Sequence, residues 1–303
     1  MQFPNSFTLL IRKILYSRLV CSPRPRYHEP MQPVHPIALT IAGSDSGAGA
    51  GIQADLKTFA SLRVYGASVL TLVTAQNTQM VSAVHLLPVP LIEQQLDAVL
   101  CDFQVGAIKT GALGSAEIIE TIASKLQDIQ VPLVVDPVMI SKHGSPLLAQ
   151  EAVTALKKCL LPLATVVTPN LHEAAAIAGM PELTCREDML TAAEGIASTG
   201  VKAVVVKGGH SAGTPADLLW TEAESNWIDG ERVDTVHTHG TGCTYSSALT
   251  VYLLRGFPMV EAAMLAKRYI TGALEHGQCF GKGINPVNHF WRHEPEFGRV
   301  YPA

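Results

Sequence analysis

Several familiar enzyme motifs are absent from this chain of 303 residues. It contains no G-x-x-x-x-G-K-[ST] phosphate-binding loop, no G-x-G-x-x-G dinucleotide fingerprint and no H-E-x-x-H zinc motif. Its six cysteines form no C-x-x-C pair and show no metal-ligand spacing, so we expect reduced thiols in a cytosol-like compartment. A nucleotide phosphate site in this chain therefore requires a different kind of loop.

Excess positive charge and long apolar runs are also lacking. The 22 lysines and arginines are outnumbered by 26 aspartates and glutamates, and the net charge of −4 gives no reason to expect a nucleic acid or an anionic membrane as partner. No uninterrupted apolar run reaches about 18 residues, so we expect no membrane span. The hydrophobic content of 48% indicates an ordinary globular protein with a sizeable core.

Acidic residues are missing from the first 28 positions, which carry several basic residues and a short apolar run. This composition fits a mitochondrial or plastid transit peptide, but we favour an over-long gene model in which Met31 is the real start. A secretory signal fits less well, because Arg12 and Lys13 break the apolar run. We expect an unstructured leader at 1–33, one domain at 34–292, a tail at 293–303, and a cytoplasmic protein unless the leader is a transit peptide.

Short apolar runs alternate with helical periodicity from Ile37 onward. Strands are predicted at 37–42, 67–74, 105–109, 133–135, 164–167 and 203–206, with a strand pair at 217–220 and 226–228 near the sheet edge. Helices are predicted at 52–62, 89–100, 115–126, 170–178, 187–198, 244–254 and 258–276. This order predicts an α/β fold in three layers, with a mostly parallel central sheet and helices on both faces.

Polar and glycine residues directly follow most of the predicted strands. In open α/β sheets, ligands bind beyond the carboxyl ends of the strands, so we expect these residues to gather on one rim. They lie at 43–51, 76, 109–112, 136, 168–173 and 207–210.

The turn Gly240-Thr241-Gly242-Cys243 leads directly into a predicted helix. Such a turn points several backbone N–H groups and the positive end of the helix dipole at one spot, which favours an anion. Cys243 falls in the first turn, where the pKa of a thiol tends to fall. We interpret the turn as a phosphate site with a reactive side chain; the alternative is a plain turn before a core helix with a small buried cysteine.

Two carboxylates on the expected rim suggest a Mg²⁺ site, because this ion prefers oxygen ligands. They are Asp136, before Pro137 at a strand end, and Glu173, three residues after Asn170. The alternatives are a turn residue before proline for Asp136 and a first-turn acid on the helix dipole for Glu173.

Three lysines and one amide complete the set of candidates. Lys142, Lys207 and Lys267 could reach phosphate oxygens, and the alternative for each is a solvated surface charge. Gln76 could hydrogen-bond the edge of a heterocycle, or could simply end its strand in a turn.

The order of the motifs resembles that of the hydroxymethylpyrimidine/phosphomethylpyrimidine kinases of thiamin biosynthesis, in the ribokinase superfamily. The resemblance runs from about Ile37 to Trp291. Its motifs are A-L-T-I-A-G-S-D at 38–45, G-A-G-I-Q-A-D-L-K-T at 49–58, T-A-Q-N-T at 74–78, V-V-D-P-V-M at 134–139, T-P-N-L-H-E-A at 168–174, V-K-G-G-H at 206–210 and H-G-T-G-C-T at 239–244. Each motif alone is weak evidence, but together they are highly specific.

The resemblance implies a ribokinase-like sandwich that uses ATP and Mg²⁺ to phosphorylate a pyrimidine alcohol and then its monophosphate. It implies that the pyrimidine is bound near Gly43, Asp55, Gln76, Ala112 and Val138. On the ATP side we expect Gly240, Thr241, Gly242, Lys207, Lys267, Thr168 and Asn170, with Asp136 and Glu173 near the Mg²⁺. Cys243 stands where many relatives carry an aspartate base, and we expect it to accept the hydroxymethyl proton. We also expect a homodimer or higher homo-oligomer.

One position departs from the family pattern. The family usually has a methionine after Lys-Ile-Gly, whereas this chain has Lys109-Thr110-Gly111-Ala112. Ala112 leaves more room, so either another side chain fills the space or the range of substrates widens; His143 also replaces a small residue. A pyridoxal kinase of the same superfamily, or a dual enzyme, is therefore the main alternative. A non-catalytic, pyrimidine-sensing regulator is another, although the intact turn at 240–243 argues against it.

Overall fold

The computed structural model describes residues 36–139, 150–209 and 215–293. The expected leader, almost all of the expected tail, Lys142, His143 and His210 lie outside these ranges.

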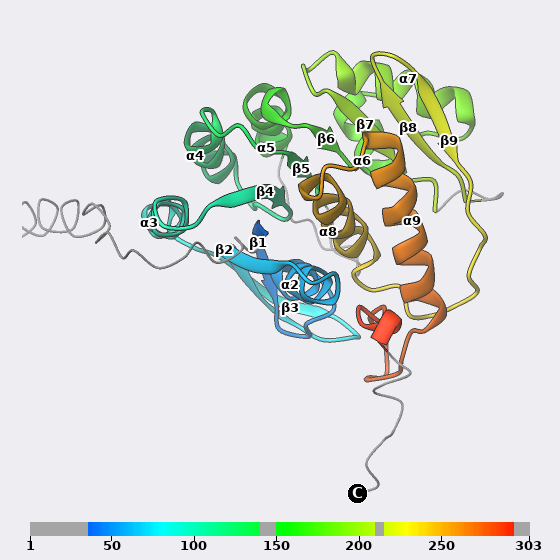
Figure 1. Cartoon of the computed structure of the whole chain (residues 1–303), viewed down its shortest axis with the longest axis horizontal. Coiled ribbons are helices and arrows are strands. Elements are labelled where there is room, and N and C mark those ends of the chain that lie inside the picture. Colours follow the sequence, from blue (N-terminus) through cyan, green and yellow to red (C-terminus); the bar gives the residue numbers. More distant parts are fainter. Residues whose placement is uncertain (1–35, 140–149, 210–214, 294–303) are drawn as a thin grey trace, which may run out of the picture.

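A single sheet of nine strands forms the centre of the described part of the chain, in the order β3-β2-β1-β4-β5-β6-β7-β8-β9 (Figure 1). The strands are β1 Ile37–Asp45, β2 Tyr65–Gln76, β3 Val81–Leu86, β4 Val105–Thr110, β5 Leu133–Val135, β6 Val166–Val167, β7 Ala203–Val206, β8 Asp217–Thr221 and β9 Ser225–Ile228. The neighbours from β2 to β7 are parallel, while β3, β8 and β9 pair antiparallel at the edges. The predicted mostly parallel sheet is confirmed.

Helices cover both faces of this sheet, as the predicted three-layer fold requires. On one face lie α3 Val89–Leu100, α4 Ala116–Leu126, α5 Gln150–Ala155, α6 Leu171–Ala178 and α7 Arg186–Ala197. On the other lie α2 Gly51–Ser61, α8 Thr241–Leu254 and α9 Met259–Glu275. None of the helices in the described ranges combines the length and apolar character needed to cross a membrane.

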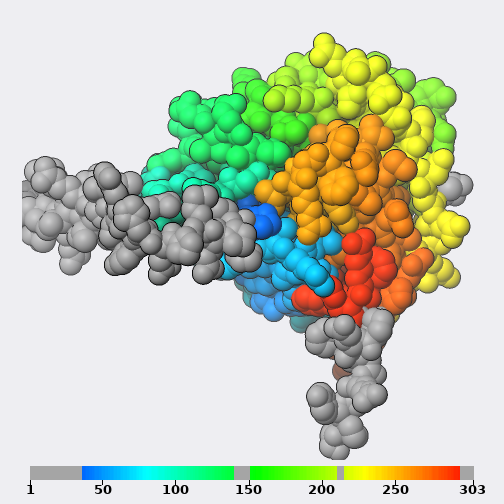
Figure 2. Space-filling view, viewed as in Figure 1, coloured from blue at the N-terminus to red at the C-terminus, as the bar shows by residue number. Residues whose placement is uncertain are grey.

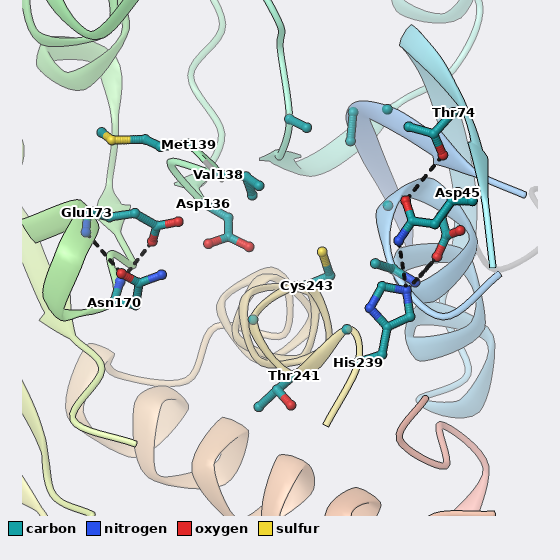
Figure 3. A pocket seen from close by; sticks show the side chains of 18 of the residues that line it. Asp45, Thr74, Asp136, Val138, Met139, Asn170, Glu173, His239, Thr241 and Cys243 are labelled. Atoms are coloured by element: carbon teal, nitrogen blue, oxygen red, sulfur yellow. Dashed lines mark hydrogen bonds and ion pairs between the residues drawn. The ribbon is translucent and has the colours of Figure 1, made fainter. Parts of the chain in front are cut away.

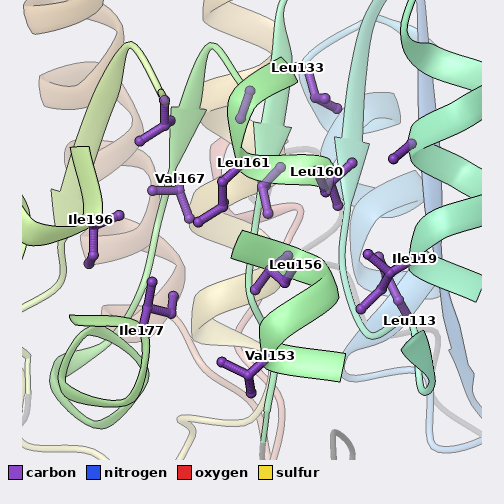
Figure 4. Packing of buried hydrophobic residues seen from close by; sticks show 14 of the residues in the cluster. Leu113, Ile119, Leu133, Val153, Leu156, Leu160, Leu161, Val167, Ile177 and Ile196 are labelled. Atoms are coloured by element: carbon purple, nitrogen blue, oxygen red, sulfur yellow. The ribbon is translucent and has the colours of Figure 1, made fainter. Parts of the chain in front are cut away.

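Side chains along each strand point alternately to the two faces of the sheet, and this divides the core into two clusters. In β7, Val204 and Val206 face the cluster under α3–α7, while Ala203 and Val205 face the cluster under α2, α8 and α9. Successive side chains of a strand point to opposite faces, so an unbroken apolar run fills both layers at once. Figure 4 shows the first cluster, in which Val167 packs near Leu160 and Leu161.

The predicted elements agree with the observed ones to within a few residues, because local signals set their ends. The hydroxyl of Ser115 accepts the N–H of Ile118 and caps α4, as expected. Asn170 and Glu173 form a reciprocal capping box at the start of α6. Two features go beyond the prediction: the exposed edge strand β3, and the helical stretch at 150–163 formed by α5, the π-helical Leu156–Leu160 and the 3₁₀-helical Leu161–Leu163.

The chain after α9 forms hydrogen bonds with segments that are far apart in the sequence. Ile284 N donates to the carbonyl of Thr78, and Val287 N donates to the carbonyl of His239. Farther on, the His293 ring lies 3.0 Å from the carbonyl of Ser61 at the end of α2. Figure 2 shows this last described segment, in red, against α2 and α9. Residues 284–293 therefore hold the β2–β3 turn, the segment before α8 and α2 together.

Candidate active site

A cavity of about 630 Å³ opens at the carboxyl ends of the parallel strands. Most residues predicted for the site line it: Gly43, Gln76, Ala112, Asp136, Val138, Asn170, Glu173, Lys207, Gly240, Thr241, Gly242 and Cys243. Three do not line it, namely Asp55, Thr168 and Lys267. The rule that ligand groups gather beyond the strand ends thus selected residues that line one cavity, but it also selected Thr168, which does not line it.

The start of α8 forms an open anion site on the cavity wall. Gly240 is its N-cap, with φ of +80°, and no side chain caps the helix. A Cβ on Gly240 would lie 1.8 Å from the carbonyl oxygen of Gly49, so only glycine fits this turn. The uncapped N–H groups of the first turn and the helix dipole favour a bound phosphate.

Cys243 lies in this first turn and faces the cavity between Asp136 and His239 (Figure 3). Burial raises the pKa of its thiol to about 12; Lys109 and the N–H of Gly51 lower it, whereas Asp55 and Asp136 raise it further. The expected fall in the pKa of Cys243 is therefore wrong, because burial and two carboxylates outweigh Lys109 and the Gly51 N–H. Its role as proton acceptor stays a prediction.

A second group of charges faces the start of α8 from β5, α6 and β7. Lys207 Nζ lies 3.2 Å from Asp136 Oδ1, and the Ser246 hydroxyl lies 3.2 Å from Asp136 Oδ2. Thr168 was expected to contact ATP, but it is completely buried and its hydroxyl lies 3.5 Å from Asp136 Oδ1. Thr168 therefore reaches the cavity only through Asp136, because its side chain lies beneath the pocket.

Glu173 has an unusual charge state in this group. Burial raises its pKa to about 7; Lys207 lowers the pKa, and Asp136 raises it. One of its oxygens accepts the N–H of Asn170 at 2.8 Å, so the side chain is held by the capping box as well. Because burial is the main cause of this rise, the carboxyl favours its neutral form more than an exposed glutamate does.

Asp136 and Glu173 fit the requirements of a Mg²⁺ site. A divalent cation would supply the positive charge that the two carboxylates lack, and Mg²⁺ commonly takes only one or two protein carboxylates. Within the described residues, no group of three or more His, Cys, Asp or Glu side chains could hold a metal ion. The other ligands would therefore be phosphate oxygens and water.

Asp55 was expected to bind the pyrimidine, and this expectation is wrong. Its side chain is completely buried, and both of its oxygens lie 2.9 Å from Lys109 Nζ. The hydroxyls of Ser247 and Thr40 also donate to it, at 2.7 and 2.6 Å. With three donor groups bound and no contact with the cavity, the carboxylate acts as a support beneath the pocket.

Lys109, the partner of Asp55, lines the cavity and was not assigned a role from the sequence. Burial lowers its pKa, but Asp55, Cys243 and Asp136 outweigh burial and raise the pKa overall. The signal that could have revealed it is a lysine inside the apolar strand V-G-A-I-K-T, because a buried lysine requires a buried acid.

Lys267 was expected to contact phosphate, but in the structure it pairs with Asp217 instead. Its Nζ lies 2.8 Å from Asp217 Oδ2, and it does not line the cavity. The other oxygen of Asp217 accepts the N–H of Gly208 at 2.9 Å. Lys267 therefore supports the loop after β7, because α9 directs its side chain toward the start of β8.

The opposite end of the cavity is apolar. An ideal Cβ on Gly43 would lie 2.5 Å from Leu72 Cδ1 and 3.7 Å from the Ala112 Cβ, so these three residues form one wall. Val138 and Met139 also line the cavity. A flat heterocycle fits such a wall, with polar groups only at its edges.

Asp45 and His239, which the sequence analysis did not select, form a polar network beside this wall (Figure 3). His239 Nε2 lies 2.8 Å from Asp45 Oδ2 and 3.2 Å from Gln76 Nε2. Asp45 also accepts the N–H groups of Gly47, Gly49 and Ala50. Burial tends to raise the pKa of Asp45, but His239 and these N–H groups lower it overall. The available signal was S-D-S-G, typical of an aspartate that bonds the backbone two residues on.

Comparisons with known proteins identify the family to which this chain belongs. A family model described as phosphomethylpyrimidine kinase matches residues 45–288. The hydroxymethylpyrimidine/phosphomethylpyrimidine kinase of Streptomyces coelicolor is 47% identical over 263 residues, covering 86% of this chain and 97% of that protein. The thiamine biosynthesis bifunctional protein ThiED of Geobacter sulfurreducens is 48% identical over 253 residues, covering 83% of this chain and 51% of that protein. An ADP complex of Bacillus subtilis pyridoxal kinase superposes with a TM-score of 0.79 at 39% identity, covering 84% of this chain and 97% of that one.

Proposed function

Because the chain belongs to the phosphomethylpyrimidine kinase family, we propose that it phosphorylates 4-amino-5-hydroxymethyl-2-methylpyrimidine with ATP and then phosphorylates the resulting monophosphate. The diphosphate produced serves thiamin biosynthesis, the process in the name of the Geobacter relative. One observation carries the proposal: a single cavity joins the uncapped start of α8 and its charged neighbours to an apolar wall that carries Gln76.

Phosphoryl transfer depends mainly on positioning and on electrostatic stabilisation of the transferred group. In our proposal, the N–H groups of Gly242 and Cys243 bind the phosphoryl group at the start of α8. Lys207 faces Gly242, since an ideal Cβ on that glycine would lie 3.3 Å from Lys207 Nζ. Lys207 is therefore placed to leave Asp136 and contact a phosphate oxygen. A Mg²⁺ held by Asp136 and Glu173 would shield the negative charge of the phosphates.

The proton balance differs between the two transfers. In the first, the hydroxymethyl oxygen forms a bond to the γ-phosphorus, the bond to ADP breaks, and the hydroxyl proton must move to a base. Cys243 can accept this proton only as a thiolate, which Lys109 and the Gly51 N–H favour and burial opposes. In the second transfer the acceptor is a phosphate oxygen that is already ionised, so no base is needed.

A two-step assay tests the function directly. The full chain is incubated with ATP, Mg²⁺ and the pyrimidine alcohol, and the products are identified by mass. We expect the monophosphate first and the diphosphate later, with Asp136→Asn strongly reducing both. A wild-type protein that binds the pyrimidine without consuming ATP would reject the kinase and favour a non-catalytic sensor.

Pyridoxal phosphorylation is a second candidate activity, alone or beside the first. The Bacillus subtilis neighbour is a pyridoxal kinase, and the small side chain of Ala112 widens the apolar wall. Turnover of pyridoxal and of the pyrimidine alcohol should be compared in the wild type and in Ala112→Met. If the extra space admits pyridoxal, the substitution lowers kcat/KM for pyridoxal by about tenfold or more, with a smaller effect on the pyrimidine. Equal effects on both substrates would remove Ala112 as a determinant of specificity.

Assembly and location are part of the proposal. We propose a homodimer formed through β3, an edge strand whose exposed side chains include Val84 and Leu86, because a partner would cover the exposed apolar groups. Light scattering of the full chain and of Val84→Lys tests this pairing. A cytoplasmic location is supported by the five cysteines in the described residues, all of which are free.

A further inference from the structure

The pair formed by Asp45 and His239 takes no part in the phosphoryl transfer described above, yet it lies at the centre of the site. His239 directly precedes Gly240, and its side chain is almost completely buried. Its backbone N–H donates to the carbonyl of Asn285 at 3.0 Å, and its carbonyl accepts the N–H of Val287 at 3.2 Å. The residue that leads into the start of α8 is therefore fixed by both its backbone and its ring.

Asp45, the other member of the pair, holds the loop before α2 by hydrogen bonds. Asp45 ends β1 and accepts the N–H groups of Gly47, Gly49 and Ala50 at 2.8, 3.0 and 2.9 Å. That loop leads to Gly51, the first residue of α2, whose N–H also acts on the thiol of Cys243. A single carboxylate–imidazole contact thus joins the turns that begin α2 and α8.

The two turns also touch directly, with little free space. An ideal Cβ on Gly49 would lie 2.2 Å from His239 Cδ2, and one on Gly240 would lie 1.8 Å from the Gly49 carbonyl oxygen. Because both positions exclude a side chain, a shift of one turn moves the other.

Gln76 also belongs to this unit. Its amide nitrogen lies 3.2 Å from His239 Nε2, the same ring nitrogen that lies 2.8 Å from Asp45 Oδ2. Its amide oxygen accepts a hydrogen bond from the Thr74 hydroxyl at 3.3 Å. Gln76, on the wall that faces the heterocycle, is thereby oriented by His239.

We propose that His239 is a positioning residue, which through Asp45 and Gln76 holds the heterocycle-binding wall and the anion-binding turn of α8 in one fixed relation. The proposal rests on the proposed kinase function. It assigns His239 no contact with the reacting atoms: it sets the distance and angle between the acceptor oxygen and the bound phosphoryl group. Loss of the correct distance and angle slows the phosphoryl transfer, but it leaves the binding of ATP largely unchanged.

Steady-state kinetics of the full chain test this role in His239→Ala, Asp45→Ala and the double variant. Each single variant should lose about 10²-fold in kcat for both phosphorylation steps, with the KM for ATP within about threefold of the wild type. Since the two residues act as one unit, the double variant should lose no more than about twofold beyond the worse single variant. His239→Gln, which keeps an N–H donor at similar reach, should recover most of kcat.

Controls separate this role from simple unfolding. His276→Ala is the matched variant, because His276 lies at the end of α9, stacked on Trp291 and outside the cavity, and it should retain wild-type kinetics. Losses that multiply in the double variant, a glutamine variant no better than alanine, or a loss confined to the KM for ATP would each overturn the proposal. If His239→Ala does not fold, Asp45→Asn and His239→Gln provide the same comparison. A wild-type protein inactive on every substrate would instead reject the proposed function.

Discussion

Two aspartate–lysine pairs flank Cys243, and they differ in how much of their bonding capacity is used. Asp55–Lys109 has both side chains fully buried; Lys109 lines the cavity, Asp55 lies beneath it, and two hydroxyls complete the carboxylate. Asp136–Lys207 lies in the cavity wall at a longer distance of 3.2 Å, with the lysine partly exposed and Glu173 nearby. The first pair is closed, because its carboxylate has its contacts filled, and it supports the fold. The second pair is open, because it has charge and donors left for a phosphate and a cation. An aspartate–lysine pair thus supports the fold where all its hydrogen-bonding groups have partners, and can bind a ligand where some of them do not.

Breaking the closed pair should give the largest change in stability. Lys109→Met leaves the Asp55 carboxylate buried without its cation, which costs about 3–5 kcal/mol of unfolding free energy. Urea unfolding of the full chain measures this loss. Lys125→Met is the control, because Lys125 pairs with Asp97 on the surface and contributes only about 0–1 kcal/mol. Similar losses in the two variants would contradict the distinction.

Breaking the open pair should affect activity instead. Lys207→Met removes a donor for phosphate oxygens, and kcat/KM should fall by about 10²–10³-fold, while the unfolding free energy falls by less than in Lys109→Met because Lys207 is partly exposed. Kinetics and urea unfolding should be measured on the same preparation. Lys202→Met, an exposed lysine just before β7, should leave both quantities unchanged. A large loss of stability with intact activity in Lys207→Met would reverse the assignment of the two pairs.

Cys243 interacts electrostatically with both pairs, and its substitution should affect the two phosphoryl transfers differently. Cys243→Ala should slow the first phosphorylation about tenfold more than the second, since only the first needs a proton acceptor. Separate assays that start from the alcohol and from the monophosphate measure the two steps. Cys159→Ala, on the other face of the sheet, serves as the control. Equal losses of rate in both steps would contradict the role of Cys243 as the proton acceptor of the first transfer.

The last comparison is a pH dependence caused by Glu173, next to the open pair. Its pKa is raised from 4.5 to about 7, so between these values the folded protein binds more protons than the unfolded chain. The unfolding free energy therefore falls as pH rises through this window, by at most about 1.4 kcal/mol per unit, and levels off above it. Glu173→Gln should remove this part of the slope in urea unfolding between about pH 5 and pH 8. An unchanged slope would show that Glu173 titrates normally.

Local signals predicted most of the fold. Apolar runs that alternate with helical periodicity gave the parallel strands and their helices, and the Ser115 cap began α4 where expected. β3 was missed because its side chains are largely exposed, so it shows no buried face. The helical stretch at 150–163 was missed because its three segments are short and of different kinds.

The site could be predicted as a rim but not as a set of contacts. The position of Asp136 after a strand and the position of Gly240 in a glycine turn before a helix predicted two residues that line the cavity. Sequence position says which end of a strand a residue occupies, but not whether its side chain points into the cavity or beneath it. Asp55 was assigned to the pyrimidine by the family resemblance, and Lys267 was assigned to phosphate by its charge and the resemblance, although each is bonded to a partner within the protein. His239 was missed for the same reason, since its partner Asp45 lies 194 residues away in the chain.

The segment after α9 has a consequence for how the protein is made. The backbone of residues 285–287 fixes His239, and residues 283 and 284 bond Thr78 beside the β2–β3 turn. During synthesis, the strands that supply Gly43 and Gln76 leave the ribosome long before these residues do. The pocket is therefore completed only after residues 285–287 have left the ribosome, and a chain cut before residue 285 lacks the contacts that fix His239.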